Sequence, residues 1–78
     1  MEIRNLVTFL RIAELQNFSK AAEQLGYSQS AVTMQIKQLE AELGAQLFER
    51  IGKQVKLTQA GERLRPHALD IVTSVQKA

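Results

Sequence analysis

The side chains with the clearest chemistry lie between residues 29 and 38, at spacings that place them on one side of a helix. A glutamine amide donates and accepts at once, which suits the edge of an adenine, while hydroxyl groups can bond bases or phosphates. A lysine further along the same side is better suited to the DNA backbone. These residues are Gln29, Ser30, Thr33, Lys37 and Gln38, with the apolar Met34 among them. The pattern is typical of base recognition, and an ordinary solvated helix surface is the alternative.

Catalysis and metal binding find little support elsewhere in the chain. The glycine pattern of a nucleophile elbow does not surround Ser19, Ser28, Ser30 or Ser74. The sequence has no cysteine and one histidine, His67, with no cluster of carboxylates beside it. We therefore expect no enzymatic activity, no metal and no cofactor, and we expect His67 to line the surface or an interface.

The size and composition of the chain predict one small folded domain. It has 78 residues, of which 45% are hydrophobic and 23% are charged. The lack of cysteine excludes a disulfide framework and suits a reducing compartment. The N-terminus alternates polar and apolar residues, so it has no signal-peptide core, and no apolar run approaches a membrane span. These features predict a soluble cytoplasmic module that does not bind membranes.

The distribution of charge is more informative than the net charge of +2. Cations outnumber acids between positions 50 and 65, where Glu62 is the opposing charge. The cations of this segment are Arg50, Lys53, Lys56, Arg63 and Arg65. A basic segment of this kind attracts phosphate, although a solvated polar surface would have the same composition.

Helical periods dominate the first half of the chain. Apolar residues recur at helical spacing over residues 2–15, and Ser19 is a natural N-cap for a short helix over residues 20–25. Gly26 then suits a helix end, and Ser28 caps a third helix that runs to about residue 43. The apolar stripe of this third helix consists of Val32, Ile36, Leu39 and Leu43. Its spacing of 4, 3 and 4 residues predicts one buried side.

The pattern changes to a short hairpin and then returns to a helix. Residues 47–50 and 54–57 read as two short strands, and Gly52 between them can supply the positive φ of a tight turn. Thr58 caps a last helix, inside which Pro66 either produces a kink or begins a separate helix. The apolar stripe of this helix continues almost to its end at near-heptad spacing, so it could pair with a twin helix.

This order of elements predicts a mainly α-helical fold with a small β-hairpin, namely a winged helix-turn-helix. The spacing of Ala22, Gly26 and Val32 supports it, because a small residue, a tight turn and a β-branched residue let two helices cross closely. An αα-corner without nucleic acid is the alternative for these three residues alone. We expect residues 1–58 to form the winged domain and residues 59–78 to form a long dimerisation helix.

Five blocks of the sequence resemble the N-terminal DNA-binding domain of LysR-type transcriptional regulators, in the right order and over essentially the whole chain. The blocks are Phe18-Ser19-Lys20-Ala21-Ala22 with Leu25, Ser28-Gln29-Ser30-Ala31-Val32-Thr33, Gln35-Ile36-Lys37-Gln38-Leu39-Glu40 with Leu43-Gly44, Leu47-Phe48-Glu49-Arg50, and Leu57-Thr58-Gln59-Ala60-Gly61. The resemblance implies a bacterial transcription factor that binds double-stranded promoter DNA. It also implies a homodimer through the last helix, a dimer or tetramer of the full-length protein, and a small-molecule effector in a C-terminal domain absent from these residues.

The expected contacts fall into three groups. Base readout is assigned to Gln29, Ser30, Thr33 and Met34. Backbone contacts are assigned to Ser19, Ser28, Lys37, Gln38, Arg50, Lys53 and Thr58, and the dimer interface to Leu64, Ala68, Ile71, Val72 and Val75. Ser19 and Thr58 are included because helix N-termini favour anions, although capping alone would also explain both residues.

Two residues leave alternatives open. Many members of the family carry arginine where this chain has Met34, so an apolar contact with a thymine methyl replaces any guanine or phosphate contact there. An exposed methionine without a function is the alternative. For Arg50 the alternative to phosphate is a salt bridge with a nearby glutamate. The competing function for the whole chain is a winged-helix module that binds a protein through the stripe from Leu64 to Val75.

Overall fold

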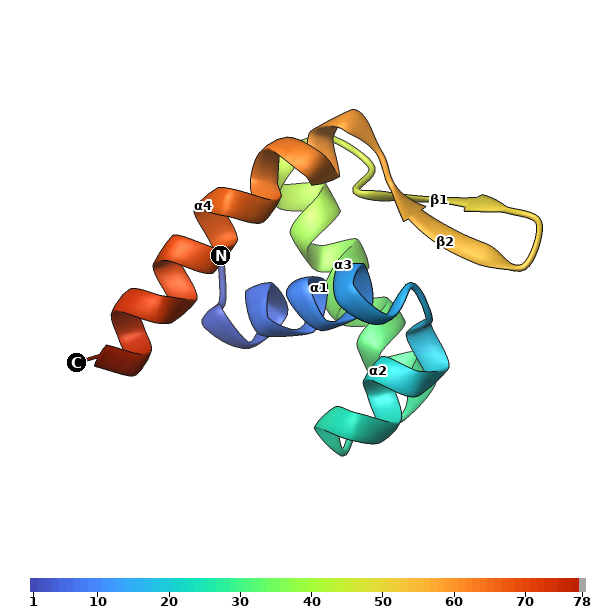
Figure 1. Cartoon of the computed structure of the whole chain (residues 1–78), viewed down its shortest axis with the longest axis horizontal. Coiled ribbons are helices and arrows are strands. Elements are labelled where there is room, and N and C mark those ends of the chain that lie inside the picture. The colour runs from blue at the N-terminus through green and yellow to red at the C-terminus, as the bar shows by residue number, and fades with distance from the viewer. Residues whose placement is uncertain (78) are drawn as a thin grey trace.

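Helices enclose the core, and a two-stranded hairpin extends from one side of it (Figure 1). The computed structural model describes residues 1–77. Its elements are α1 (Ile3–Leu15), α2 (Phe18–Leu25), α3 (Gln29–Leu43), β1 (Phe48–Ile51), β2 (Gln54–Leu57) and α4 (Gln59–Lys77). This arrangement confirms the mainly α-helical winged helix-turn-helix expected from the sequence.

The apolar side of α1 lies at the centre of the core. Leu6, Phe9 and Ile12 are fully buried there, and α1 contacts α2, α3 and α4. Figure 1 shows α1 crossing in front of α3, with α4 running past its N-terminal end. The first helix is therefore the support on which the other three are positioned.

The helix α2 begins two residues earlier than its sequence predicts, at Phe18, and Ser19 is not its N-cap. Asn17 has the extended backbone of a cap, and its side-chain oxygen accepts the N–H of Lys20 at 2.8 Å. Phe18 is thereby drawn into the first turn, where its ring packs against Phe48. The predicted stop at Gly26 is confirmed, because this residue has a φ of 78° that glycine adopts without strain.

The helix α3 is capped as predicted and buries most of the predicted stripe. The Ser28 hydroxyl accepts the N–H of Ala31 at 3.1 Å, and Val32 is fully buried. Leu43 is wrongly predicted as core, since 41% of it is exposed. It lies in the last turn of α3 beside an open hollow, so one side of it stays uncovered.

The hairpin has the register Phe48↔Leu57, Glu49↔Lys56, Arg50↔Val55 and Ile51↔Gln54. Gly52 has a φ of 63° and the next residue does not share this conformation, which is the pattern of a type II′ turn. The first strand starts at residue 48 and not at 47, because Leu47 is buried in the core. Its N–H donates to Glu40 Oε2 at 2.7 Å, which fixes the chain just before it pairs with β2.

The helix α4 runs without a break from Gln59 to Lys77 and has Pro66 inside it, so the alternative of a separate helix that begins at Pro66 is wrong. Its start is capped by the Thr58 hydroxyl, which accepts the N–H of Gly61 at 3.1 Å. Ala68 and Val72 are buried and belong to the same apolar cluster as the α1 residues. The contact between α1 and α4 therefore closes the core.

Candidate nucleic-acid interface

The outer surface of α3 carries a shallow hollow of about 450 Å³. The residues that line it are Gln29, Ser30, Thr33, Met34 and Lys37. All of them were singled out from the sequence, and the structure brings them onto one surface. Met34 is 73% exposed at the centre of this set, so the apolar side chain is presented to solvent and not to the core. The surface offers amide, hydroxyl, thioether and ammonium groups side by side.

Gln29 is held by a neighbour from α2. The Ser19 hydroxyl donates to Gln29 Oε1 at 2.8 Å, and both side chains are exposed. One lone pair of this oxygen is therefore used within the protein, while its second lone pair and both amide hydrogens remain available. The contact differs from the phosphate contact expected of Ser19, because its hydroxyl is directed at Gln29.

The opposite edge of α3 is fastened to α1 by two glutamines. Asn5 Nδ2 donates to Gln38 Oε1 at 3.1 Å, and Thr8 Oγ1 donates to Gln35 Oε1 at 2.6 Å. Asn5 and Thr8 are both buried, so these bonds satisfy polar groups that lie away from water. Gln38 was expected at the DNA backbone; in the structure it is exposed, and its side-chain oxygen accepts the Asn5 amide and helps to orient α3.

Thr58 and Ser28 use their hydroxyl groups inside the protein. The Thr58 hydroxyl donates to the carbonyl of Gln46 while it accepts the N–H of Gly61. Its single proton is therefore committed, and capping accounts for this residue. The Ser28 hydroxyl caps α3 and lies 3.2 Å from the hydroxyl of Ser30, at the exposed start of α3.

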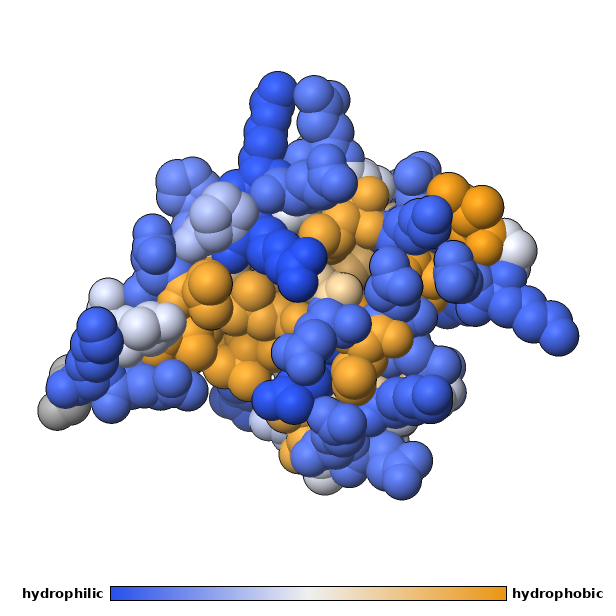
Figure 2. All heavy atoms as spheres, in the orientation of Figure 1, coloured by the Kyte–Doolittle hydropathy of each residue, from blue (hydrophilic) through white to orange (hydrophobic). Residues whose placement is uncertain are grey.

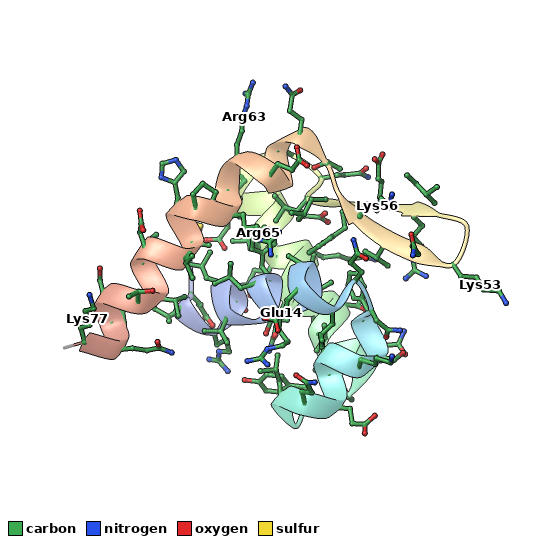
Figure 3. All side chains as sticks on the ribbon, in the orientation of Figure 1. Glu14, Lys53, Lys56, Arg63, Arg65 and Lys77 are labelled. Atoms are coloured by element: carbon green, nitrogen blue, oxygen red, sulfur yellow. The ribbon has the colours of Figure 1, made fainter. Side chains whose placement is uncertain are left out.

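The hairpin contributes two cations in different settings. Lys53 projects into solvent at the tip of the hairpin (Figure 3). The guanidinium carbon of Arg50 lies over the ring of Phe18, 5.8 Å from its centroid. Within residues 1–77 Arg50 forms no ion pair, so the alternative of a salt bridge with glutamate is wrong. Sequence reasoning missed the role of Phe18, because no local pattern links residues this far apart.

The apolar stripe of α4 divides between the core and the surface. Ala68 and Val72 were expected at a dimer interface, but both are already buried against this chain. Leu64 is half-buried on the same core. The exposed apolar residues of α4 are Leu69, Ile71 and Val75, of which Leu69 was not predicted. Figure 2 shows apolar side chains gathered where α4 passes α1, with hydrophilic side chains around them.

The sequence model described as "Bacterial regulatory helix-turn-helix protein, lysR family" matches residues 3–62, which is most of the chain. The chain belongs to this LysR family. The matched segment holds the whole helix-turn-helix, both strands of the hairpin and the first turn of α4.

Curated relatives of this LysR-family chain are longer proteins. It is 46% identical over 78 residues to the uncharacterized HTH-type transcriptional regulator YwqM of Bacillus subtilis, covering 100% of this chain and 27% of that protein. It is 47% identical over 78 residues to the HTH-type transcriptional regulator ShiR of Corynebacterium glutamicum, covering 100% of this chain and 26% of that protein. The chain thus spans about a quarter of the length of the relatives it matches.

Solved structures resemble this LysR-family chain over nearly its full length, α4 included. A crystal structure of the CbnR DBD with DNA has a TM-score of 0.93 and 38% identity, and the match covers 99% of this chain and 88% of that one. The BenM DBD with catB site 1 DNA has a TM-score of 0.92 and 39% identity, and that match covers 99% and 83% of the two chains.

Two negative findings apply to the described part of this LysR-family chain. Residues 1–77 contain no group of three or more His, Cys, Asp or Glu side chains that could hold a metal ion. Over the same range, none of the helices combines the length and the apolar character needed to cross a membrane.

Proposed function

We propose that this chain is the sequence-specific DNA-binding part of a bacterial transcription regulator. One observation carries the proposal: the exposed surface of α3 presents Gln29, Ser30, Thr33, Met34 and Lys37 beside a hairpin with a basic tip. An α-helix fits the major groove of DNA, and its polar side chains can then reach base edges. The similarity to LysR-family structures crystallised with DNA supports the same function.

Each residue of the α3 surface has a distinct chemical task in this proposal. Gln29 binds the N6 and N7 atoms of an adenine, while Ser30 and Thr33 bond bases or phosphates. Met34 packs against the C5-methyl group of a thymine, which a charged side chain would not do. Ser28, Lys37, Arg50 and Lys53 contact the backbone, with Lys53 entering or bordering a minor groove. Ser19, Gln38 and Thr58 have positioning roles, in keeping with their bonds inside the protein.

We also propose that two copies pair through the exposed side of α4. Ile71 and Val75 supply the apolar surface and the half-buried Leu64 lies on the same side of the helix, whereas the exposed Leu69 lies about 160° from Ile71 around the helix axis. Pairing would place two α3 helices in successive major grooves, about 34 Å apart. The rest of the protein would hold an effector-binding domain that switches transcription in the cytoplasm.

Replacing Gln29 with alanine should relax the preference for particular bases, whereas Lys53→Ala should weaken binding to all DNA sequences by a similar factor. A bidentate amide contributes about 1–3 kcal/mol of discrimination between bases, while a phosphate contact carries no sequence information. The experiment selects bound duplexes from random DNA at fixed salt, and then compares the enriched motifs of the two variants with that of the parent chain. The parent should enrich a dyad-symmetric motif with half-sites about one helical turn apart.

A Gln29→Ala variant that enriched the parent motif unchanged would contradict direct readout by this residue. Recovery of unselected DNA by the parent chain and by a full-length chain would contradict sequence-specific binding altogether. Glu23→Ala is a suitable control, because Glu23 is exposed on α2 and is assigned no contact with DNA.

A Val75→Glu variant should be monomeric, because a charge at the exposed side of α4 would be desolvated on pairing. Sedimentation velocity measures the change directly. Ser74→Glu is the matched control, since it adds the same charge at the adjacent exposed position outside the apolar set. Leu64 is a poorer site for this test, because it also packs on the core. Val75→Glu remaining dimeric at the concentration where the parent pairs would refute the proposed interface.

A further inference from the structure

A second hollow, of about 280 Å³, lies between α3 and the hairpin. Lys37 of α3 and Arg50 of β1 both line it, so two cations from separate elements border one space. Phe18 of α2 forms part of its wall. Both cationic residues are exposed, which leaves their charged groups accessible to a ligand.

The position of Arg50 is fixed by an aromatic chain that reaches the core. Its guanidinium lies over the Phe18 ring, and this ring meets Phe48 edge-on, with centroids 5.6 Å apart and an interplanar angle of 72°. Phe48 in turn contacts the fully buried Phe9, with centroids 5.4 Å apart. Arg50 and Phe48 are two residues apart on β1 and therefore share one side of the hairpin. Stacking on a ring restricts the guanidinium while leaving its N–H donors free for a ligand.

The acidic residue of this hollow, Glu40, is engaged in the fold. It is half-buried, and its Oε2 accepts the N–H of Leu47 at 2.7 Å. Glu40 thereby fastens the segment that leads into β1, and one of its oxygens is turned toward the backbone. The two cations are consequently the groups that a ligand in the hollow meets from outside.

This second hollow adjoins the exposed surface of α3. Thr33 and Lys37 line both this space and the shallow hollow around Met34. If α3 occupies a major groove and the hairpin tip approaches the next minor groove, the sugar-phosphate backbone between the grooves must cross the space between them.

We infer that Lys37 and Arg50 bind one and the same DNA phosphate in the hollow between α3 and the hairpin, and that Phe18 is a positioning residue for Arg50. This inference rests on the proposed function. The ligand chemistry is a single phosphodiester anion held by an ammonium group from one side and a guanidinium group from the other.

The test uses the selected duplex with one neutral methylphosphonate linkage at a time. In the parent protein, neutralising the linkage that faces Lys37 and Arg50 in each half-site should lower affinity about tenfold or more, because a charge-assisted contact from both cations is lost there. The linkage that meets Lys53 should be sensitive as well, but independently of these two residues. Lys37→Ala and Arg50→Ala should each weaken binding to the unmodified duplex. In both variants a methylphosphonate at the linkage that faces Lys37 and Arg50 should lower affinity less than it does in the parent. Lys56→Ala is the matched control from the same hairpin, since Lys56 lines a different hollow with Gln16 and Arg65.

Phe18→Leu alone does not test the positioning role of Phe18, because it also removes packing on Phe48 and can affect folding. A second variant, Arg50→Lys, is therefore used. Arg50→Lys keeps the charge but loses the planar stacked group. In this variant a methylphosphonate at the same linkage should therefore still lower affinity, but by less than in the parent. Phe18→Leu should give the same partial profile, with its folding checked by thermal unfolding. If the methylphosphonate lowered the affinity of Arg50→Lys as much as that of the parent, the positioning role of Phe18 would be overturned. This result does not depend on whether Phe18→Leu folds.

The outcomes separate the inference from the proposed function. If the two alanine variants lost their methylphosphonate sensitivity at two different linkages, the shared phosphate would be overturned while DNA binding stayed intact. A parent protein that binds the duplex with no sensitive linkage would overturn it as well. Failure of the parent and the full-length chain to bind any duplex would overturn the proposed function itself.

Discussion

Gly61→Ala is expected to destabilise the domain strongly, although it adds a single methyl group. A Cβ at this buried position would lie 2.3 Å from the carbonyl oxygen of Leu47 and 2.8 Å from Cδ2 of Leu57. The first neighbour is backbone and cannot rotate away, and its oxygen also accepts the N–H of Thr58 at 3.0 Å. Relief therefore requires the start of α4 to separate from the base of the hairpin. We expect a cost of about 3 kcal/mol or more, at the upper end of overpacking.

Thermal unfolding followed by circular dichroism checks this expectation. For a domain of this size the cost corresponds to a fall in Tm of about 15 °C or more. Arg63→Ala is the matched control, because Arg63 lies exposed in the same helix and alanine favours a helix there. A Gly61→Ala variant whose Tm stays within a few degrees of the parent would show that α4 and the hairpin are not tightly joined at this point.

Raising the salt concentration from about 50 to 200 mM should weaken DNA binding by about 10²-fold. In each subunit the exposed Lys37 and Arg50 share one phosphate and the exposed Lys53 meets another, which makes about four neutralised phosphates in a dimer. With a slope near −0.9 per phosphate, the logarithm of the association constant falls between three and four times as fast as the logarithm of salt rises, about 3.6 times. Fluorescence anisotropy of a labelled duplex over a salt series measures this slope.

Two variants test whether the hairpin contributes to this salt dependence. Lys53→Ala should reduce the magnitude of the slope by nearly two in a dimer, since one phosphate contact is lost per subunit. Lys77→Ala should leave it unchanged, because Lys77 lies at the far end of α4, away from the hairpin (Figure 3). A slope near zero for the parent chain would favour the competing function, a protein-binding module that uses the stripe from Leu64 to Val75.

The sequence was sufficient to predict the elements and the exposed surface of α3. The 4-3-4 spacing of Val32, Ile36, Leu39 and Leu43 specifies a helix, and a helix with a buried side must expose Ser30, Met34 and Lys37 on the other. Gly26 and Gly52 were equally predictable, because a positive φ selects glycine. These features follow from local rules that act over a few residues.

The features that escaped prediction depend on contacts across the chain. Asn17 and Ser19 are both good capping residues, and the choice between them is made by the packing of Phe18 on Phe48. The stripe of α4 shows that Ala68 and Val75 are apolar, but periodicity does not distinguish a side covered by α1 from one left open. The pairing of Arg50 with Phe18, and not with a glutamate, likewise joins distant segments.

The packing of α1 against α4 has a consequence for how the domain is made in the cell. Because the first and last elements share one apolar cluster, the cluster is incomplete until Ala68 and Val72 have been synthesised. Chains grow from the N-terminus at a rate of about 5–20 residues per second, so α1, α2 and α3 are synthesised before α4 is available to pack against α1. A nascent chain that ends at the hairpin leaves part of the α1 surface open to water and to chaperones. The domain thus reaches its final rigidity only after α4 has emerged from the ribosome.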